Sequence, residues 1–162
     1  MKRFLTILFL LSTCLLWGQN NSQCSTVITA SLVNGLSTQL INPNLDFGET
    51  ILDGNASVVN KAPDKGINIK ILGHPQKNVI LSYSPVSLSC ASGKLNFTPD
   101  VRHTNADPVY SDPVAVPNGS GLTLKNINGD GVLYVWIGGD ISINKDQPAG
   151  DYSGSFLVTV SY

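Results

Sequence analysis

The last thirty-one residues constrain the fold of this chain more than any other stretch. Residues 132–162 contain two long runs rich in β-branched and aromatic residues, separated by the turn-forming stretch 146–151. In the second run, apolar, aromatic and small residues at the even positions 152–162 alternate mostly with Ser and Thr, a period of two that fits a strand and not a helix. We therefore predict a C-terminal β-hairpin with one face in the core. The adjacent Gly138 and Gly139 predict a bulge, a bend or a crossing between sheets.

The rest of the chain predicts short strands at the regular spacing of a β-sandwich. One strand is expected within residues 25–40, broken by the turn signal Asn34-Gly35. The remaining expected strands are residues 45–48, 56–60, 67–72, 78–83, 86–90, 95–98 and 122–125. We expect the segments 86–90 and 95–98 to form one hairpin, and 122–125 to form another with the strand that starts at Val132.

Residues 99–121 contain four prolines, so we predict a mostly irregular surface segment with at most one edge strand. Together these signals predict one all-β domain over residues 25–162, an immunoglobulin-like or Greek-key antiparallel β-sandwich. The expected core residues are Leu45, Phe47, Ile69, Ile71, Leu81, Leu133, Val135, Phe156, Val158 and Val160.

Residues 1–18 predict a secretory signal peptide, because Lys2 and Arg3 precede an apolar run without acidic residues. That run is too short for a transmembrane helix, and no other segment is long enough, so we expect no transmembrane segment in the mature chain. Residues 19–24 are expected to be a flexible start. A lipoprotein, lipidated at Cys14, is the alternative, but the apolar residues that follow Cys14 fit it poorly.

The charge of the mature chain argues against a nucleic-acid partner. Removing Lys2 and Arg3 leaves eight Lys and Arg against eleven Asp and Glu, a net charge of about −3. Nucleic-acid binding would instead require a basic face with phosphate-contacting side chains. Low charge combined with many Ser, Thr, Asn and Gly residues is typical of an extracellular β-protein.

The two cysteines of the mature chain, Cys24 and Cys90, are a candidate disulfide. In an oxidising compartment, closing a loop of this length stabilises a fold by about 4 kcal/mol in the chain-entropy model. Two free thiols that never meet remain the alternative, because a sequence gives no geometry. Neither cysteine has a partner at metal-ligand spacing, so we predict no metal site.

Other candidate chemistry is sparse. Residues 126–131 (NINGDG) space three side-chain oxygens as a calcium loop does, but the position of the bidentate Glu is taken by Ile137, so a turn is favoured. His74 and His103 are expected to be solvated loop residues. Asp46 is expected to be a structural aspartate at a turn. We find no hydrolase, metalloprotease or phosphate-binding motif, and so predict no catalytic residue and no cofactor.

Three aromatic residues, Trp136, Tyr134 and Tyr110, are candidates for a glycan-binding surface. For Trp136, inside the C-terminal hairpin, core packing is the better interpretation. Tyr110 lies in the proline-rich segment, where exposed contact and packing are equally supported by the sequence.

Two stretches carry a family resemblance. LYVWIGGDISINKDQPAGDYSGSFLVTVSY at the C-terminus and LDFGETI at residues 45–51 resemble the DUF4402 family of secreted bacterial proteins. The C-terminal turn and strand are also similar, more distantly, to spore-coat U domains, the subunits of archaic chaperone–usher pili. The resemblance implies an immunoglobulin-type fold and a role in the periplasm or on the outer surface of a Gram-negative bacterium, as in Bacteroidetes. It implies no reaction.

The similarity to pilin subunits also suggests how such a domain would act. In those domains the last strand of an immunoglobulin set is supplied by the N-terminal extension of the next subunit. Carried over, this makes residues 24–36 a candidate donor strand, with Ile28, Ala30 and Leu32 inserting into a neighbour. We therefore expect a structural or adhesin-like (fimbrial-subunit-like) surface protein that can self-associate. The alternative is a monomeric binding module whose loop at residues 99–117 holds a glycan or peptide.

Overall fold

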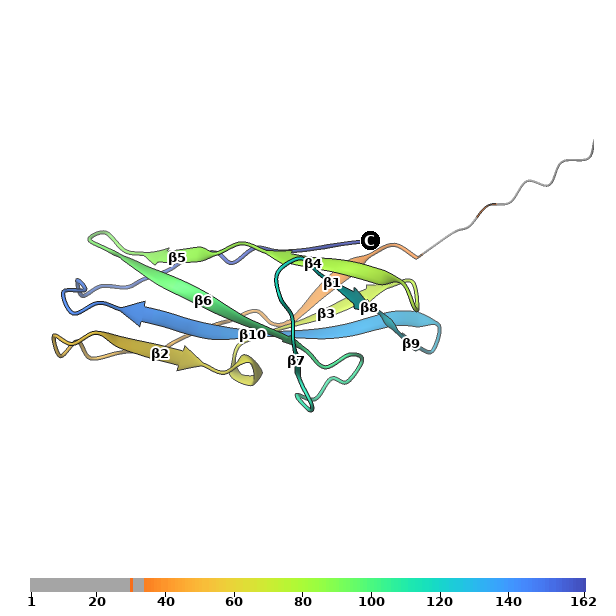
Figure 1. Cartoon of the computed structure of the whole chain (residues 1–162), viewed down its shortest axis with the longest axis horizontal. Helices are drawn as coiled ribbons and strands as arrows, with labels where there is room; N and C mark the ends of the chain where they lie inside the picture. The colour runs from red at the N-terminus through yellow and green to blue at the C-terminus, as the bar shows by residue number, and fades with distance from the viewer. Residues whose placement is uncertain (1–29, 31–33) are drawn as a thin grey trace, which may run out of the picture. The chain divides into compact units, whose positions relative to one another are not determined.

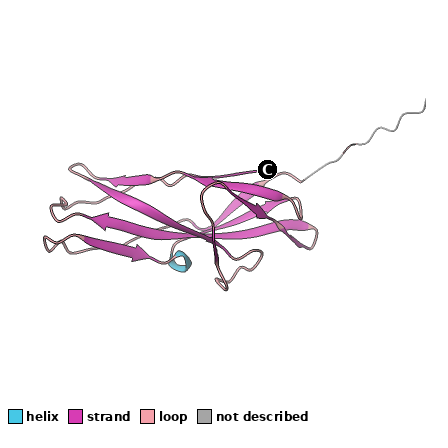
Figure 2. Ribbon diagram, in the orientation of Figure 1, coloured by secondary structure: helices cyan, strands magenta, loops and turns pink. Residues whose placement is uncertain are grey.

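A computed structural model describes residue 30 and residues 34–162 of the chain. The expected signal peptide, Cys24, Ile28 and Leu32 lie outside the described residues, and Ala30 is exposed without regular structure. The described chain is all-β, with antiparallel sheets and a single 3₁₀ turn, Pro63–Lys65 (Figures 1 and 2). This confirms the predicted fold class.

Two sheets make up the domain. The larger sheet has the order β1-β3-β10-β6-β5, and β2 and β9 also pair with β10 while β7 pairs with β6. Its strands are β1 (Ser37–Asn42), β2 (Ser57–Lys61), β3 (Ile67–Gly73), β5 (Val86–Ser89), β6 (Lys94–His103), β7 (Val114–Ala115), β9 (Lys125–Ile127) and β10 (Asp130–Ile143). The smaller sheet has the order β11-β4-β8. Its strands are β4 (Asn78–Tyr83), β8 (Ser120–Thr123) and β11 (Val158–Ser161).

The central strand is β10, the longest of the chain (Figure 1). One of its edges pairs with β3 up to Ile137 and with β2 from Gly139 onward, while the other edge pairs with β6. A Cβ at Gly138 would overlap the carbonyl oxygen of Lys61, and one at Gly139 would overlap that of Thr98. The two glycines therefore mark the point where β10 changes partner. The strand neither breaks nor changes sheet there.

One core lies between the two sheets. Its fully buried members include Ile71, Leu133 and Ile137 from the larger sheet and Val79 and Leu81 from the smaller. Five of the ten predicted core residues, Ile69, Ile71, Leu81, Leu133 and Val135, are buried here. The other five, Leu45, Phe47, Phe156, Val158 and Val160, are half-buried and pack against core residues, so their predicted inward direction is confirmed.

The predicted C-terminal hairpin is wrong. β11 pairs with β4 in the smaller sheet, while β10 lies in the larger sheet, and the C-terminal segment first forms an isolated bridge from Ser153 to Ser89. The alternation of residues 152–162 correctly predicted which of their side chains face the core. It could not predict the neighbouring strand, because a period of two determines which side chains share a face and not which strand pairs alongside.

Three other strand predictions need correction. Residues 99–103 belong to β6, where Pro99 is tolerated because β5 and β7 pair with other parts of that edge. Residues 45–48 form no strand. The segment 122–125 splits, since β8 pairs with β4 and β9 pairs with β10, with the fully buried Leu124 between them. The hairpin of β5 and β6 is confirmed.

The close approach at Gly138 makes a testable prediction. Gly138→Ala should lower the free energy of unfolding by about 1–3 kcal/mol, because the new methyl group must displace the backbone of residues 61–63. Gly121→Ala in β8 is the matched control, since a Cβ there meets no atom within 4 Å and should change stability by less than about 0.5 kcal/mol. Urea denaturation of both variants measures the difference. Equal effects would show that the approach of β2 to β10 is not tight.

Candidate strand-binding groove

The smaller sheet covers only part of the larger one. At about 3.3 Å per residue, the fourteen residues of β10 extend about 46 Å, whereas the six residues of β4 extend about 20 Å. Beyond the reach of β4, four inward-facing residues form a second cluster, Leu95 and Phe97 of β6 and Ile141 and Ile143 of β10. No strand of the smaller sheet is assigned over this cluster among the described residues.

Two segments outside the strands border this uncovered face. Leu45 and Phe47 come from the segment between β1 and β2, and Tyr152 and Phe156 come from the segment between β10 and β11. The ring of Phe97 lies edge-on to both Phe47 and Phe156, with centroids 6.0 and 5.7 Å away. Between these segments the structure has an apolar groove of about 1020 Å³, lined by residues 43–52 and 147–156 and by side chains of β5, β6 and β10.

Within residues 34–162, the backbone on both borders of the groove has no strand partner. Among the described residues, the backbone N–H groups of residues 45–52 make one hydrogen bond, from Gly48 to the Asp46 carboxylate at 2.8 Å. Residues 154–157 belong to no ladder, and β11 pairs with β4 on one edge only. Leu40 and Ile41 of β1 are neighbours on opposite faces, yet both are more than half exposed, so neither face is covered at this edge. These backbone groups are free to pair with another extended chain.

A polar cluster lies at the far end of the groove, around the β5–β6 turn. Gln147 donates hydrogen bonds from Nε2 to the Tyr152 hydroxyl at 2.6 Å and to the Lys94 carbonyl, and Tyr152 donates to the Pro148 carbonyl at 2.7 Å. The half-exposed Cys90 lies beside this cluster, because a Cβ placed at Gly150 would be 3.2 Å from its Sγ. The Tyr152 hydroxyl, followed by the backbone of Ser92, lowers the pKa of the Cys90 thiol.

At the other end of the C-terminal strand, three residues tie the beginning of the described chain to its end. The Tyr162 hydroxyl donates to the Asn34 carbonyl at 2.7 Å and accepts from the His74 backbone N–H at 2.7 Å. The Asn34 backbone N–H donates in turn to Nδ1 of His74. The chain therefore enters the described domain beside the last residue of the C-terminal strand.

The structure shows the contacts of the three candidate aromatic residues. Tyr110 is half-buried and lies edge-on to Trp136, with ring centroids 5.4 Å apart. Trp136 is 9 % exposed and donates a hydrogen bond from Nε1 to Thr104, which confirms its packing role. The Lys70 ammonium lies over the ring of Tyr134 on the neighbouring strand. Of the two interpretations of Tyr110, packing is the one the structure supports.

The remaining candidates have structural roles. Asp46 accepts a hydrogen bond at a turn, as predicted, and Asn126 caps the β9–β10 turn by accepting from Gly129. Burial, followed by the charge of Lys125, lowers the pKa of His103, which favours the neutral imidazole.

Within residues 34–162, no cluster of three or more His, Cys, Asp or Glu side chains is placed to hold a metal ion. Cys90 forms no disulfide with any described residue, and Cys24 lies outside them.

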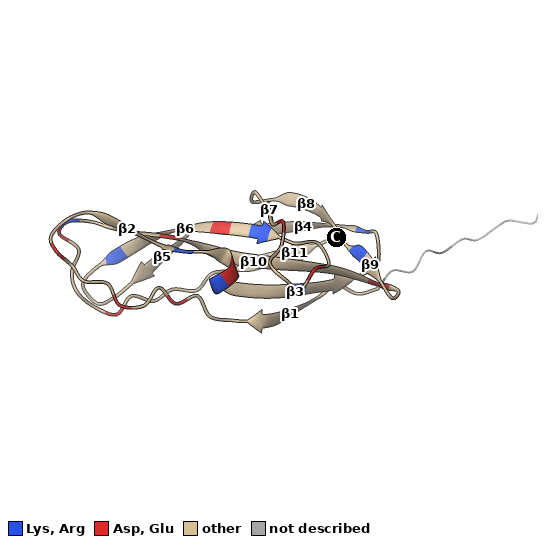
Figure 3. Cartoon of the chain, turned by 90° about the horizontal axis from the view of Figure 1, so that it is seen from below, with Lys and Arg blue, Asp and Glu red and all other residues tan. Residues whose placement is uncertain are grey.

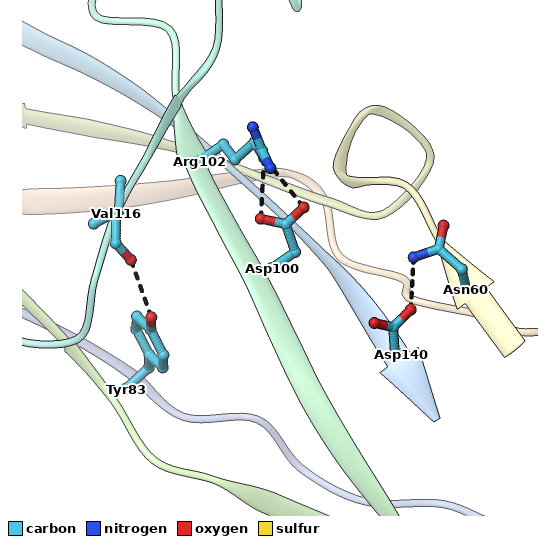
Figure 4. A network of polar contacts seen from close by, with 6 residues as sticks. All are labelled: Asn60, Tyr83, Asp100, Arg102, Val116 and Asp140. Carbon is cyan, nitrogen blue, oxygen red and sulfur yellow. Dashed lines mark hydrogen bonds and ion pairs between the residues drawn. The ribbon is translucent and has the colours of Figure 1, made fainter. Parts of the chain in front are cut away.

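Charges are sparse and scattered over the domain (Figure 3). Figure 4 shows three polar contacts, one within β6 and two between different segments of the chain. Arg102 pairs with Asp100 along β6 at 3.0 Å, Asn60 donates to Asp140 across β2 and β10, and the Tyr83 hydroxyl donates to the Val116 carbonyl. None of them lines the groove, whose floor is apolar and whose borders carry polar side chains such as Asp46, Glu49 and Asp151.

The groove was not predicted from the sequence. The alternation of Leu95 with Phe97 and of Ile141 with Ile143 marks one apolar face on each strand. This alternation cannot show that the apolar face of β6 and β10 is left uncovered, because that depends on where the strands of the smaller sheet end. The sequence signals for the bordering segments were the predicted inward directions of Leu45, Phe47 and Phe156.

Fold and groove together define an antiparallel β-sandwich module with one open apolar groove. Among the described residues there is no helix with the length and apolarity needed to cross a bilayer. The family model for DUF4402, a domain of unknown function, matches residues 47–162. The chain belongs to the DUF4402 family, which confirms the resemblance seen in its C-terminal residues. No curated protein matches the chain.

The packing of Tyr110 makes a second prediction. Tyr110→Ala should lower the free energy of unfolding by about 1–2 kcal/mol, because it removes the edge contact with Trp136. Val109→Ala is the control, since Val109 is 65 % exposed and should contribute less than about 0.5 kcal/mol. Thermal and urea unfolding measure both. An unchanged stability for Tyr110→Ala would instead favour a role in surface contact.

Proposed function

We propose that this protein is a secreted, non-enzymatic structural or adhesin-like surface protein that acts through β-strand pairing and surface contacts. The observation that carries the proposal is the groove, whose floor is apolar and whose borders have no strand partner within the described part of the chain. An extended chain is the ligand that suits such a site. Its backbone can pair with the borders while every second side chain enters the apolar floor.

The energetics of the groove support an extended apolar segment as the partner. Burying one side chain of the size of Ile or Leu contributes about 1.5–3 kcal/mol, and each backbone hydrogen bond adds about 0.5–1.5 kcal/mol. Residues 25–36 of a neighbouring copy supply Ile28, Ala30 and Leu32 at alternating positions. Self-association through this segment is the mode of action that follows, in the periplasm or on the outer surface of a Gram-negative bacterium.

The alternative function, a monomeric glycan- or peptide-binding module, has weaker support. Its expected contact residue, Tyr110, is half-buried and packs edge-on against Trp136. The exposed apolar side chains of that loop, Val109 and Val114, are 65 % and 52 % exposed and are the observations that favour it. A peptide ligand would be accommodated better by the groove than by this loop.

The proposal predicts the effect of a charge in the groove. In the full mature chain under reducing conditions, Leu88→Lys should weaken binding of a synthetic peptide of residues 25–36 at least tenfold, about 1.4 kcal/mol, because Leu88 packs against the groove cluster. Ser87→Lys, on the opposite face of the same strand, should leave the affinity within about twofold. Calorimetric titration measures the binding, and circular dichroism checks that both variants fold.

Two results would contradict the proposal. One is the absence of peptide binding to the reduced wild-type chain. The other is an equal loss of affinity for both lysine variants, which would place the peptide outside the groove.

A further inference from the structure

The sequence contains four Asn-X-Ser/Thr sequons, the acceptor pattern for an N-linked glycan in an exported protein. They begin at Asn20, Asn55, Asn96 and Asn118. Asn20 lies outside the described residues. A three-residue pattern of this kind occurs often by chance, so the other three sequons are separated by the structure around each acceptor amide and each hydroxyl.

The sequon at Asn96 lies in the middle of β6. Asn96 is opposite Ser87 of β5 on one side and opposite Ser142 of β10 on the other. The middle residue of the sequon, Phe97, is buried and packs in the groove cluster. An enzyme that surrounds this sequon must first separate β6 from both neighbouring strands, which breaks backbone hydrogen bonds at a cost of about 0.5–1.5 kcal/mol each.

The sequon at Asn118 is held by its own hydrogen bonds. Oδ1 of Asn118 accepts from the Tyr83 backbone N–H at 2.8 Å. Oγ of Ser120 donates to the Pro117 carbonyl at 2.6 Å. The side chains of both the acceptor residue and the hydroxyl residue are therefore engaged in the turn that joins residues 117–120 to β4.

The sequon at Asn55 lies in the exposed turn between the groove border and β2. Asn55, Ala56 and Ser57 are all exposed, and a Cβ at Gly54 would meet no atom within 4 Å. Within this sequon, Ser57 alone belongs to a strand, opposite Ile143 at the end of β10. An enzyme can therefore reach the acceptor amide from solvent while the larger sheet stays paired.

Asp53 holds this turn in shape. Its Oδ1 accepts a hydrogen bond from the Asn55 backbone N–H at 3.0 Å. This bond, followed by one from the side-chain amide of Asn55, lowers the pKa of Asp53, so the carboxylate stays charged near neutral pH. The turn is thus formed by its own residues and presents the sequon at the surface.

The chain on both sides of Asn55 also carries exposed apolar side chains. Ile51 is 92 % exposed and Val58 is 65 % exposed, and both lie within four residues of Asn55 along the chain. Exposed apolar side chains favour association with other chains. A bulky, hydrated oligosaccharide beside them would oppose such association.

We propose that Asn55 is the acceptor of an N-linked oligosaccharide, added to the folded domain by an oligosaccharyltransferase. This inference rests on the export that belongs to the proposed function, because N-linked glycans are carried by exported proteins. It adds a modification site outside the groove, since Asn55 is not among the residues that line it.

The reaction is a group transfer without a redox change. Its donor is an oligosaccharide bound through C1 to a lipid pyrophosphate. Nδ2 of Asn55 attacks C1, so that a C–N bond forms and the bond from C1 to the phosphate oxygen breaks. The lipid pyrophosphate leaves with that electron pair, and the amide loses one proton.

The first test uses the full mature chain, folded and without glycan, with an oligosaccharyltransferase that accepts Asn-X-Ser/Thr peptides. The donor is a disaccharide of N-acetylglucosamine on lipid pyrophosphate. Mass spectrometry should show one disaccharide per chain, located on Asn55 by peptide mapping. Ser57→Ala should lower the yield at least tenfold, whereas Thr98→Ala, which removes the Asn96 sequon, should leave it within about twofold.

Peptides of residues 51–59, 92–100 and 114–122 separate the effect of the fold from that of the sequence. Relative to its own peptide, Asn55 should be modified in the folded chain at a rate reduced less than about threefold, and Asn96 and Asn118 at rates reduced more than about tenfold. Equal reductions at the three sites would overturn the proposal, as would an unmodified Asn55 in the chain isolated from the cells that produce it. In both cases, binding of the peptide of residues 25–36 that Leu88→Lys weakens would leave the proposed function standing.

Discussion

The mismatch in length between β10 and the sheet that packs on it is the constraint on which the rest of the structure depends. A sandwich is covered only as far as its shorter sheet reaches, and here the three strands of the smaller sheet have four to six residues each. The glycine pair at 138–139 lets the larger sheet continue past that point, because β2 can approach β10 closely where β3 ends. Among the residues that the structure describes, the second half of the larger sheet thus has strand partners at its edges but no second sheet over its apolar face.

This arrangement determines what can occupy the groove. Apolar side chains form the floor, and the two bordering segments offer backbone N–H and C=O groups beside polar side chains such as Asp46, Glu49 and Asp151. An extended peptide would pair with those backbone groups in a regular ladder and fill the floor with alternate side chains. Exposed strand edges are also a risk for uncontrolled association.

Much of the fold was predictable because it depends on local alternation. The inward faces of residues 45–47, 67–72 and 152–160 follow from the period of two, and the β5–β6 hairpin follows from its turn residues. Strand partners were not predictable, since residues 132–143 and 158–161 have equal strand character yet lie in different sheets. Tyr110 shows the same limit, because its contact with Trp136 joins a loop to a strand that is distant in sequence. The groove depends on the relative lengths of two sheets, which no single segment contains.

A crystal structure of the mature chain in complex with a peptide of residues 25–36 tests the central claim most directly, which is that the groove between residues 43–52 and 147–156 binds an extended strand. The result predicted is an extended segment in that gap, paired with the backbone of at least one border and with alternate side chains on Phe97 and Ile141. The contradicting result is a domain in which the two borders contact each other across the gap and leave no space for a strand.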